Sequence, residues 1–202
     1  MNDFEKALSK YIGDGNLRKL QTIRVGIAGA GGLGSNCAFN LVRSGFKKLK
    51  IIDFDVVEHS NLDRQFYFLD QVGKPKVEAL RENLYRINPD LDLEIIIETV
   101  TEGNIKSLFE QCDVVVEAFD KVLYKRLMVE AFFSSGKLLV SASGLGGWGN
   151  SDAIVVKEIH PKFYIVGDLI SEVNDNVPPI SPRVNIAAAK QADVILNWVL
   201  SQ

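Results

Sequence analysis

The chain has 202 residues, of which 47% are hydrophobic and 24% are charged, a balance typical of a globular protein with a substantial core. Its formal net charge of −3 gives no general attraction to nucleic acid or to an anionic membrane, so we expect neither as a partner. The first residues lack the apolar stretch of a signal peptide, which predicts a cytoplasmic location. The length fits a single domain over residues 1–202.

The chain begins with a segment of helical character. Residues 3–12 carry apolar side chains at helical spacing and predict a helix, which Gly13 and Gly15 end. Such a helix either packs on the flank of the domain or faces a second subunit, and the pattern does not separate these possibilities.

A glycine-rich turn follows the first predicted strand. The apolar run at 24–28 leads directly into Gly29, Gly31 and Gly34, a Gly-x-Gly-x-x-Gly turn before a predicted helix at 33–44. The first glycine allows a tight turn, the second lets the backbone approach a phosphate, and the third lets the helix pack on the sheet. The free N–H groups at the start of the helix would face the anion. Without its context the pattern is also compatible with an ordinary loop.

An acidic residue ends the second predicted strand, which spans 49–54. Asp53 lies 19 residues after Gly34, close to the spacing expected for a carboxylate that binds ribose hydroxyls. The alternative is an aspartate that caps a turn. A connection without clear periodicity follows at 55–74, and a long structured loop of this kind is usually functional.

The remaining elements alternate between helices and strands. The predicted elements are a helix at 75–87, a strand at 93–97, a helix at 104–111, a strand at 113–118, a helix at 121–134 and a strand at 137–143. This order predicts an α/β fold with a Rossmann-like, doubly wound and mostly parallel sheet. Near the C-terminus, an additional strand pair at 153–159 and 163–166 is expected to extend the sheet. A polar loop at 171–182 precedes an apolar helix at 184–200, which is expected in the core or at a subunit contact.

Basic and amide side chains gather in and after the long connection. They are Asn61, Arg64, Gln65 and Lys76. Arginine presents a planar fork and lysine a point charge to phosphate oxygens, so Arg64 and Lys76 could converge on phosphates at the glycine turn. Asp120 follows a buried strand and could hold Mg²⁺ together with ATP oxygens. Read singly, the two cations are also compatible with surface charges, and Asp120 with a helix N-cap.

Five segments together resemble the ThiF/MoeB/HesA family, the ubiquitin-activating-enzyme-like group. They are 29–36 (GAGGLGSN), 53–66 (DFDVVEHSNLDRQF), 72–80 (VGKPKVEAL), 87–89 (INP) and 117–120 (EAFD). The resemblance covers about residues 20–200. Within the family, the short length and the late segment PRVNIAAAKQAD look most like the compact bacterial members of thiamine biosynthesis.

The resemblance implies ATP as substrate, Mg²⁺ as its counterion, and a role for each matching residue. Gly32 and its neighbours would contact the phosphates, Asp53 the ribose, and Asp120 the metal. The nucleotide-binding set would be Gly29, Gly31, Gly32, Gly34, Asp53, Asp55, Asn61, Arg64, Gln65, Lys76 and Asp120, with Arg64, Lys76 and Asp120 catalytic. The implied reaction is adenylation of the C-terminal glycine carboxylate of a small ubiquitin-like, ThiS-like sulfur carrier, with release of pyrophosphate. The family also favours a homodimer.

Several positions depart from the family pattern. The chain has no C-x-x-C pair, so zinc is not implied, and the loop at 174–182 lacks the cysteine that bonds to the carrier in many relatives. Cys37 and Cys112 are expected to be inert core thiols, which predicts adenylation without a covalent carrier–enzyme link. Lys121 stands where the family often has asparagine. The role of an N-terminal arginine that reaches the partner subunit's ATP is not transferred to Arg18 or Arg24.

Three alternatives remain open from the sequence. The glycine turn with Asp53 alone would also suit an NAD-dependent oxidoreductase, although that reading leaves Arg64, Gln65 and Lys76 unexplained. A molybdopterin-synthase carrier would present a similar Gly-Gly tail to an adenylyltransferase of the same family. A non-enzymatic member that binds ATP without turnover is the third.

Overall fold

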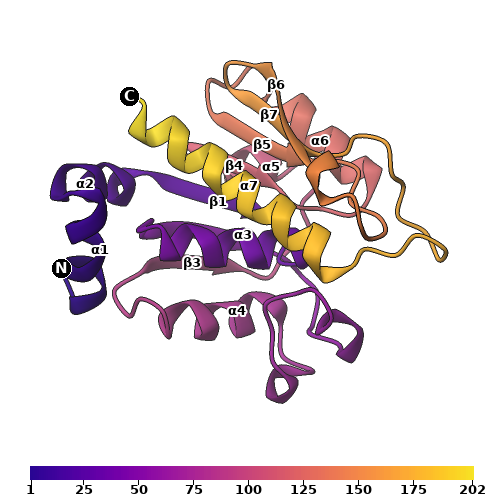
Figure 1. Ribbon diagram of the computed structural model, residues 1–202, viewed down its shortest axis with the longest axis horizontal. Coiled ribbons are helices and arrows are strands. Elements are labelled where there is room, and N and C mark those ends of the chain that lie inside the picture. Colours follow the sequence, from indigo (N-terminus) through magenta and orange to yellow (C-terminus); the bar gives the residue numbers. More distant parts are fainter.

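A computed structural model describes all residues, 1–202, as one seven-stranded sheet with helices on both faces (Figure 1). The strands are β1 (Arg24–Ala28), β2 (Lys48–Ile52), β3 (Asp92–Ile96), β4 (Val114–Glu117), β5 (Leu138–Ala142), β6 (Val155–His160) and β7 (Phe163–Gly167). The helices are α1 (Asp3–Ile12), α2 (Asp14–Thr22), α3 (Gly32–Arg43), α4 (Lys76–Tyr85), α5 (Ile105–Leu108), α6 (Val122–Phe132) and α7 (Ser181–Leu200). Short 3₁₀ turns are η1 (His59–Asn61), η2 (Leu69–Gln71) and η3 (Ser151–Ala153).

The strand order β3-β2-β1-β4-β5-β7-β6 confirms the predicted doubly wound sheet. All neighbouring pairs are parallel except β6 and β7, which form the expected antiparallel pair at one edge. The chain moves outward from β1 to β3 and then returns to the other side of β1 at β4. The direction of winding therefore reverses between β1 and β4, and ligands bind in sheets of this kind at the carboxyl ends of such strands.

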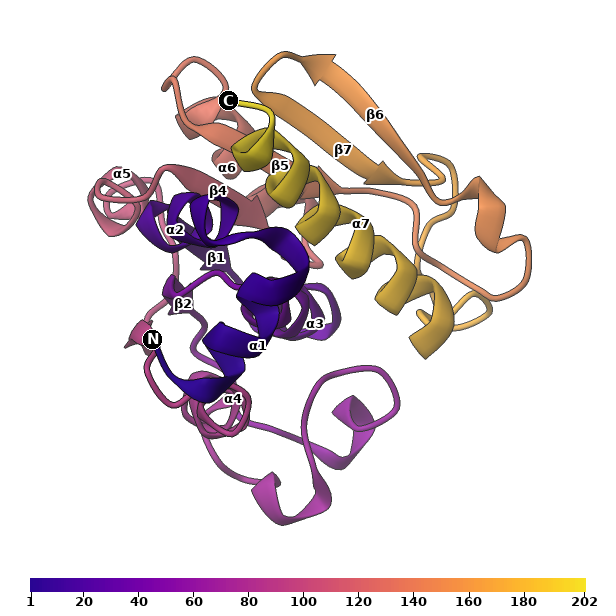
Figure 2. The same ribbon diagram turned by 60° about the vertical axis from the view of Figure 1, so that its left-hand side comes forward.

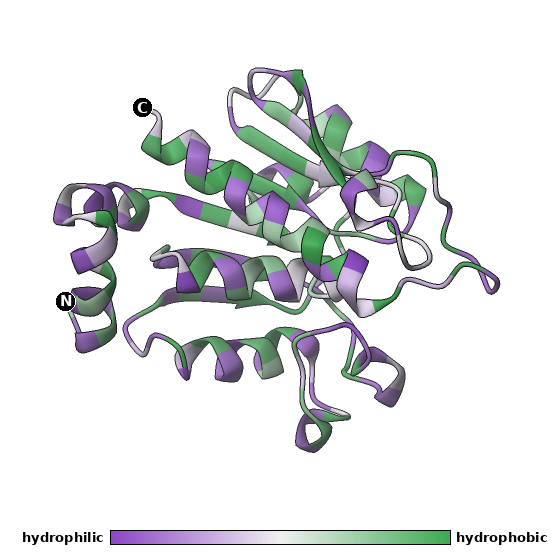
Figure 3. Cartoon of the chain, in the orientation of Figure 1, coloured by the Kyte–Doolittle hydropathy of each residue, from purple (hydrophilic) through white to green (hydrophobic).

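The core has two layers, one on each face of the sheet (Figure 2). The larger layer lies under α3, α4 and α7, and the smaller one lies under α5 and α6. Consecutive residues of β1 contribute to different layers: Ile27 belongs to the larger and Ala28 to the smaller, because side chains alternate across a strand. The central strands β4 and β5 are buried along their whole length and the edge strand β6 is exposed, and the helices carry mixed faces (Figure 3).

The C-terminal helix belongs to the core of this chain. α7 packs along α3, and small side chains allow the two helices to approach closely. The buried residues of its inner face include Ala187, Ala188, Ala192 and Ile195. The prediction left open whether this helix forms core or a subunit contact, and in the structure its apolar face is covered by the same chain. No helix, α7 included, is long and apolar enough to cross a membrane.

The prediction missed a second N-terminal helix. We expected Gly13 and Gly15 to end helical structure, but only Gly13 does so, with a φ of +84°, and α2 begins at the next residue. Gly15 lies in the first turn of α2, and Leu17 and Leu20 anchor the helix in the core with at most 1% exposure. Two buried leucines thus outweigh the low helix propensity of one glycine.

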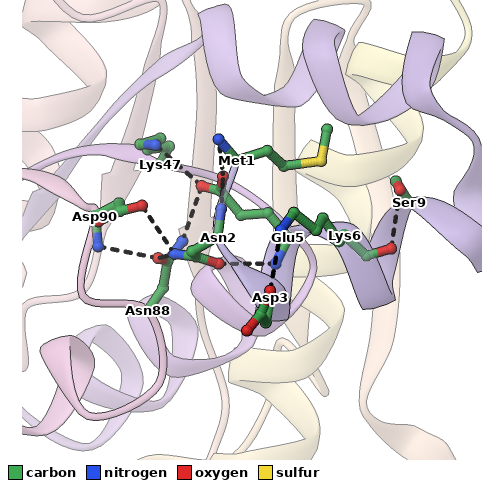
Figure 4. A network of polar contacts seen from close by, with 9 residues as sticks. All are labelled: Met1, Asn2, Asp3, Glu5, Lys6, Ser9, Lys47, Asn88 and Asp90. Carbon is green, nitrogen blue, oxygen red and sulfur yellow. Dashed lines mark hydrogen bonds and ion pairs between the residues drawn. The ribbon is translucent and has the colours of Figure 1, made fainter.

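A buried carboxylate fastens α1 to the domain (Figure 4). Glu5 is 1% exposed, and its Oε1 accepts hydrogen bonds from Lys47 at 3.0 Å and from Asn88 at 3.4 Å. Asn2 caps the helix by accepting from the Glu5 N–H at 2.9 Å. Burial by itself would raise the pKa of Glu5, but the hydrogen bonds from Lys47 and Asn88 outweigh it, so the pKa lies below its ordinary value.

We expect Glu5→Gln to lower the free energy of unfolding by about 1–2 kcal/mol at pH 7, because the charged hydrogen bonds with Lys47 are lost. Because the pKa of Glu5 is lower in the folded state, the carboxylate stabilises the folded protein at pH values above its unfolded pKa. This contribution disappears as the pH falls through the folded pKa. Urea unfolding at pH 7 and at a series of lower pH values should therefore show a difference between variant and wild type that shrinks as the pH falls.

Glu130→Gln is the matched control, because Glu130 forms only an exposed pair with Arg126 on α6. A loss of stability in Glu5→Gln that is the same at every pH value of the series would contradict the assigned role of the charge.

Candidate functional site

The turn between β1 and α3 requires glycine at two positions. Gly29 has a φ of +102°, and a Cβ built there would lie 2.9 Å from the Ala118 carbonyl oxygen at the end of β4. A Cβ on Gly34 would lie 1.8 Å from the Gly29 carbonyl oxygen. The turn is therefore pressed against β4 on one side and against the first turn of α3 on the other.

The open side of this turn presents unpaired backbone donors. The N–H groups of residues 31–34 donate to no acceptor in the chain. Gly31 and Gly32 are partly exposed, and no heavy atom comes closer than 4.0 Å to a Cβ built on Gly31. Free N–H groups at the start of a 12-residue helix, with its positive dipole end, form a favourable environment for an anion such as phosphate.

Asp53 lies beside this turn, where the sequence places a ribose ligand. Its Oδ2 accepts from the Ala30 N–H at 2.6 Å, and its Oδ1 accepts from the Asp55 N–H at 2.8 Å. The side chain is partly exposed. Each carboxylate oxygen has a second lone pair, so Asp53 can support the turn and still accept from a sugar hydroxyl.

Side chains of α3 tie the long connection to the glycine turn. The Phe66 N–H donates to Ser35 Oγ at 3.0 Å, and Asn36 Nδ2 donates to the Arg64 carbonyl at 2.8 Å. The Tyr67 hydroxyl, which is buried, donates to the Ala30 carbonyl at 2.6 Å. The sequence pattern predicted no role for these side chains, although Ser35 and Asn36 lie inside the motif 29–36.

A buried pair of side-chain amides, Gln71 in the connection and Asn83 on α4, holds the connection against α4. Gln71 and Asn83 exchange two side-chain hydrogen bonds, of 2.8 and 3.0 Å, and Asn83 also donates to the Phe66 carbonyl at 2.8 Å. The connection is thus held between α3 and α4 by polar contacts. Because a buried amide without a partner is costly, this pair specifies one arrangement of the loop.

Both predicted phosphate-binding cations are engaged with carboxylates. Arg64 donates to Asp63 at 2.7 Å and to the Ser60 carbonyl at 3.1 Å. Lys76, whose side chain is 9% exposed, lies 2.7 Å from Asp55. The aliphatic part of Arg64 is nevertheless within 3.6 Å of a Cβ built on Gly32, so the residue lies at the glycine turn.

The two predicted amide ligands differ in position. Asn61 is buried and accepts from the Glu58 N–H at 3.0 Å, so its oxygen closes a 3₁₀ turn within the loop. Gln65 Nε2 lies 4.0 Å from a Cβ built on Gly31, and Gln65 Oε1 is buried without a hydrogen-bond partner. Of the two, Gln65 is therefore the amide that lies at the open glycine turn.

Asp120 follows β4, across the reversal point from the glycine turn. It is exposed and forms no hydrogen bond or ion pair within the chain. The turn that carries it is held by Glu117, which is fully buried and accepts from Lys125 at 3.0 Å, from the Phe119 N–H at 2.7 Å and from Ser141 at 2.5 Å. This network leaves the Asp120 carboxylate without a partner, just past the carboxyl end of β4.

A second buried ion pair holds the connection into α7. Arg183 in the first turn of α7 donates to Asp168 and, at 3.1 Å, to the Gly149 carbonyl. Asp168 also accepts from the Ile170 and Ser171 N–H groups. Burial by itself would raise the pKa of Asp168, but these hydrogen bonds and Arg183 outweigh it and lower the pKa.

Comparison with known proteins adds a family assignment to this geometry. A family model described as the ThiF family matches residues 5–196. The sulfur carrier protein ThiS adenylyltransferase of Bacillus subtilis (strain 168) is 35% identical over 147 residues, which cover 71% of this chain and 44% of that protein. The tRNA threonylcarbamoyladenosine dehydratase 2 of Saccharomyces cerevisiae is 34% identical over 178 residues, which cover 86% of this chain and 38% of that protein. The chain thus spans less than half of the length of either relative.

A solved structure shares the fold over nearly the whole chain. The Escherichia coli tRNA N6-threonylcarbamoyladenosine dehydratase TcdA in complex with AMP matches with a TM-score of 0.88 and 20% identity, covering 97% of this chain and 93% of that chain. The same protein in complex with ATP matches with a TM-score of 0.86. At this level of identity the likeness concerns the fold.

Two glycines of the motif, Gly34 and Gly31, differ in their tolerance of a methyl group. We expect Gly34→Ala to lower the free energy of unfolding by about 3 kcal/mol or more, because the new Cβ would overlap the Gly29 carbonyl. Gly31→Ala, whose Cβ would meet open space, should change stability by no more than about 0.5 kcal/mol. Urea unfolding of both variants checks this expectation, and equal losses would contradict the packing described above.

Proposed function

The chain belongs to the ThiF family, and from that premise we propose that it is an ATP-dependent adenylyltransferase acting on the C-terminal carboxylate of a small ubiquitin-like sulfur carrier. The observation that carries the proposal is the set of unpaired N–H groups at 31–34, with the Asp53 carboxylate on one side and the free Asp120 carboxylate on the other. This arrangement suits a nucleotide whose ribose and phosphates span the reversal point of the sheet.

ATP fits the donors that the turn offers. The N–H groups at 31–34 would bind phosphate oxygens, and Asp53 would accept from the ribose. Asp120 would hold Mg²⁺ together with the phosphates. No group of three or more His, Cys, Asp and Glu side chains is arranged around a common point, and Mg²⁺ needs none, because it usually binds through one or two carboxylates plus substrate phosphates and water. The bound ion would neutralise phosphate charge.

The proposed reaction needs no general base from the protein. A C-terminal carboxyl group has a pKa of roughly 3.3–3.7, so it is an anion at neutral pH. Its oxygen would attack the α-phosphorus of ATP, the bond to the bridging oxygen would break, and pyrophosphate would leave with both electrons of that bond. The products are an acyl adenylate and pyrophosphate. The chain's task is to align the carboxylate with the α-phosphate and to offset the charge that develops on the leaving group.

Arg64 and Lys76 are the cations that we propose for this charge. Both now pair with exposed carboxylates, Asp63 and Asp55, which are 51% and 49% exposed. Each cation pairs with a carboxylate that is about half exposed, so a triphosphate with several negative charges can compete with that carboxylate for the cation. Asp55 would then hold Lys76 near the site until ATP arrives.

For the carrier, we propose a ThiS-like protein of thiamine biosynthesis with a C-terminal Gly-Gly, and a cytoplasmic homodimer as the working form. The Bacillus subtilis relative supports this choice. A molybdopterin-synthase carrier is the alternative within the same reaction class. A second candidate function is ATP-dependent activation of a tRNA-borne carboxylate, favoured by the long match to the yeast dehydratase. The net charge of −3 argues against tRNA as the partner.

The proposal predicts ATP–pyrophosphate exchange that requires both the carrier and Mg²⁺. Asp120→Ala should lower the exchange rate by about 100-fold or more without a change in the circular dichroism spectrum, because its carboxylate has no structural partner. Asp193→Ala is the matched control, since Asp193 is exposed on α7 and forms no ion pair or hydrogen bond. NAD binding without any exchange would favour the oxidoreductase instead, and full activity of Asp120→Ala would remove its assigned role.

The two cysteines should not take part in the reaction. Burial raises the pKa of the Cys37 thiol to about 12 and that of Cys112 to about 11, so neither is a thiolate at neutral pH. We expect Cys37→Ser and Cys112→Ser to exchange pyrophosphate within about twofold of wild type wherever they remain folded. Incubation with carrier and ATP should give no thiol-sensitive covalent adduct on a denaturing gel, and the appearance of one would show a covalent step that we do not propose.

A further inference from the structure

The two peptide groups that meet at Ala30 are each held by one side chain. The Ala30 N–H donates to Asp53 at 2.6 Å, and the Ala30 carbonyl accepts from the Tyr67 hydroxyl, also at 2.6 Å. Tyr67 comes from the long connection, 37 residues away in sequence, and is 5% exposed. A buried hydroxyl that reaches the middle of a glycine turn is more than packing requires, because phenylalanine would fill nearly the same volume.

The geometry of a peptide group links this contact to the phosphate-binding side. In a trans peptide the C=O and the N–H point in opposite directions. A carbonyl that accepts from Tyr67 therefore directs the Gly31 N–H away from Tyr67, and this N–H donates to no acceptor in the chain. Gly31 follows this peptide, and because glycine has no Cβ, the φ angle of Gly31 offers little resistance to rotation of the peptide. A rotated peptide would present an oxygen, which repels phosphate.

The backbone next to Tyr67 is held from two helices. The preceding residue, Phe66, donates its N–H to Ser35 on α3 at 3.0 Å and accepts from Asn83 on α4 at 2.8 Å. Burial, and then the charges of Asp53 and Asp55, raise the pKa of Tyr67 well above its ordinary value, so the hydroxyl remains protonated and remains a donor.

We propose that Tyr67 is a positioning residue for the nucleotide, whose hydroxyl keeps the Ala30–Gly31 peptide oriented with the Gly31 N–H toward the phosphates. This inference rests on the proposed binding of ATP at the glycine turn. It adds a residue that touches no substrate atom and acts through the backbone.

The test is Tyr67→Phe, which removes the hydroxyl and keeps the ring. We expect ATP to bind roughly tenfold more weakly by isothermal titration calorimetry, because the orientation of one phosphate-binding N–H is no longer held. In ¹⁵N–¹H spectra, the Gly31 resonance should shift on ATP addition to the wild type and should be broadened in the ligand-free variant by rotation of the peptide. Tyr11→Phe is the matched control, since Tyr11 is 88% exposed.

The outcomes separate this inference from the proposed function. A wild type that does not bind ATP overturns the proposed function, and the inference with it. A wild type that binds ATP and a Tyr67→Phe variant that binds within twofold of it overturn the inference alone. Weaker binding accompanied by resonance changes throughout the core, with Gly31 no more affected than its neighbours, assigns Tyr67 to general packing and also overturns it. Thermal unfolding identifies a temperature at which both proteins are folded for these measurements.

Discussion

The structure depends on a close approach of backbone to backbone where β1 meets β4 and α3. The Gly29 turn lies against the Ala118 carbonyl, and Gly34 lies against the Gly29 carbonyl, with no room for a side chain at either glycine. This approach brings the end of β1, the start of α3 and the end of β4 to one point. The same three elements carry the unpaired N–H groups at 31–34 and the Asp120 carboxylate, so the packing constraint and the proposed site share one location.

Apolar packing builds the sheet and its two layers, whereas polar contacts shape the site. The connection 55–74 contributes few side chains to the core and is held by hydrogen bonds from Ser35, Asn36 and Asn83. Hydrogen bonds are directional, so they define one loop conformation where hydrophobic contact alone would tolerate several. The Glu117 network does the same for the turn that carries Asp120.

The proposed phosphate-binding side of the glycine turn is open, and the two cations proposed for it lie close by. Arg64 and Lys76 rest on exposed carboxylates, and Asp53 supports the glycine turn by accepting from its backbone. The charges that an incoming triphosphate would need are therefore present beside the turn, where each is paired with a half-exposed carboxylate. A buried pair such as that of Arg183 with Asp168 serves a different purpose, because it fixes the route of the chain into α7.

The sequence by itself determined the alternation of strands and helices, the doubly wound sheet with its final strand pair, and the glycine turn with Asp53 near it. These features follow from local periodicity and from residue types at short spacing, so they can be read from neighbouring residues. The sequence pattern did not predict α2. This helix is stabilised by the burial of Leu17 and Leu20 in the core, which local helix propensity around Gly15 does not reveal. Only the tertiary structure brought Tyr67 to Ala30, paired Gln71 with Asn83, and placed Lys125 and Ser141 on Glu117. Those contacts join residues from different elements, and the sheet topology that brings them together has no signature in any single segment.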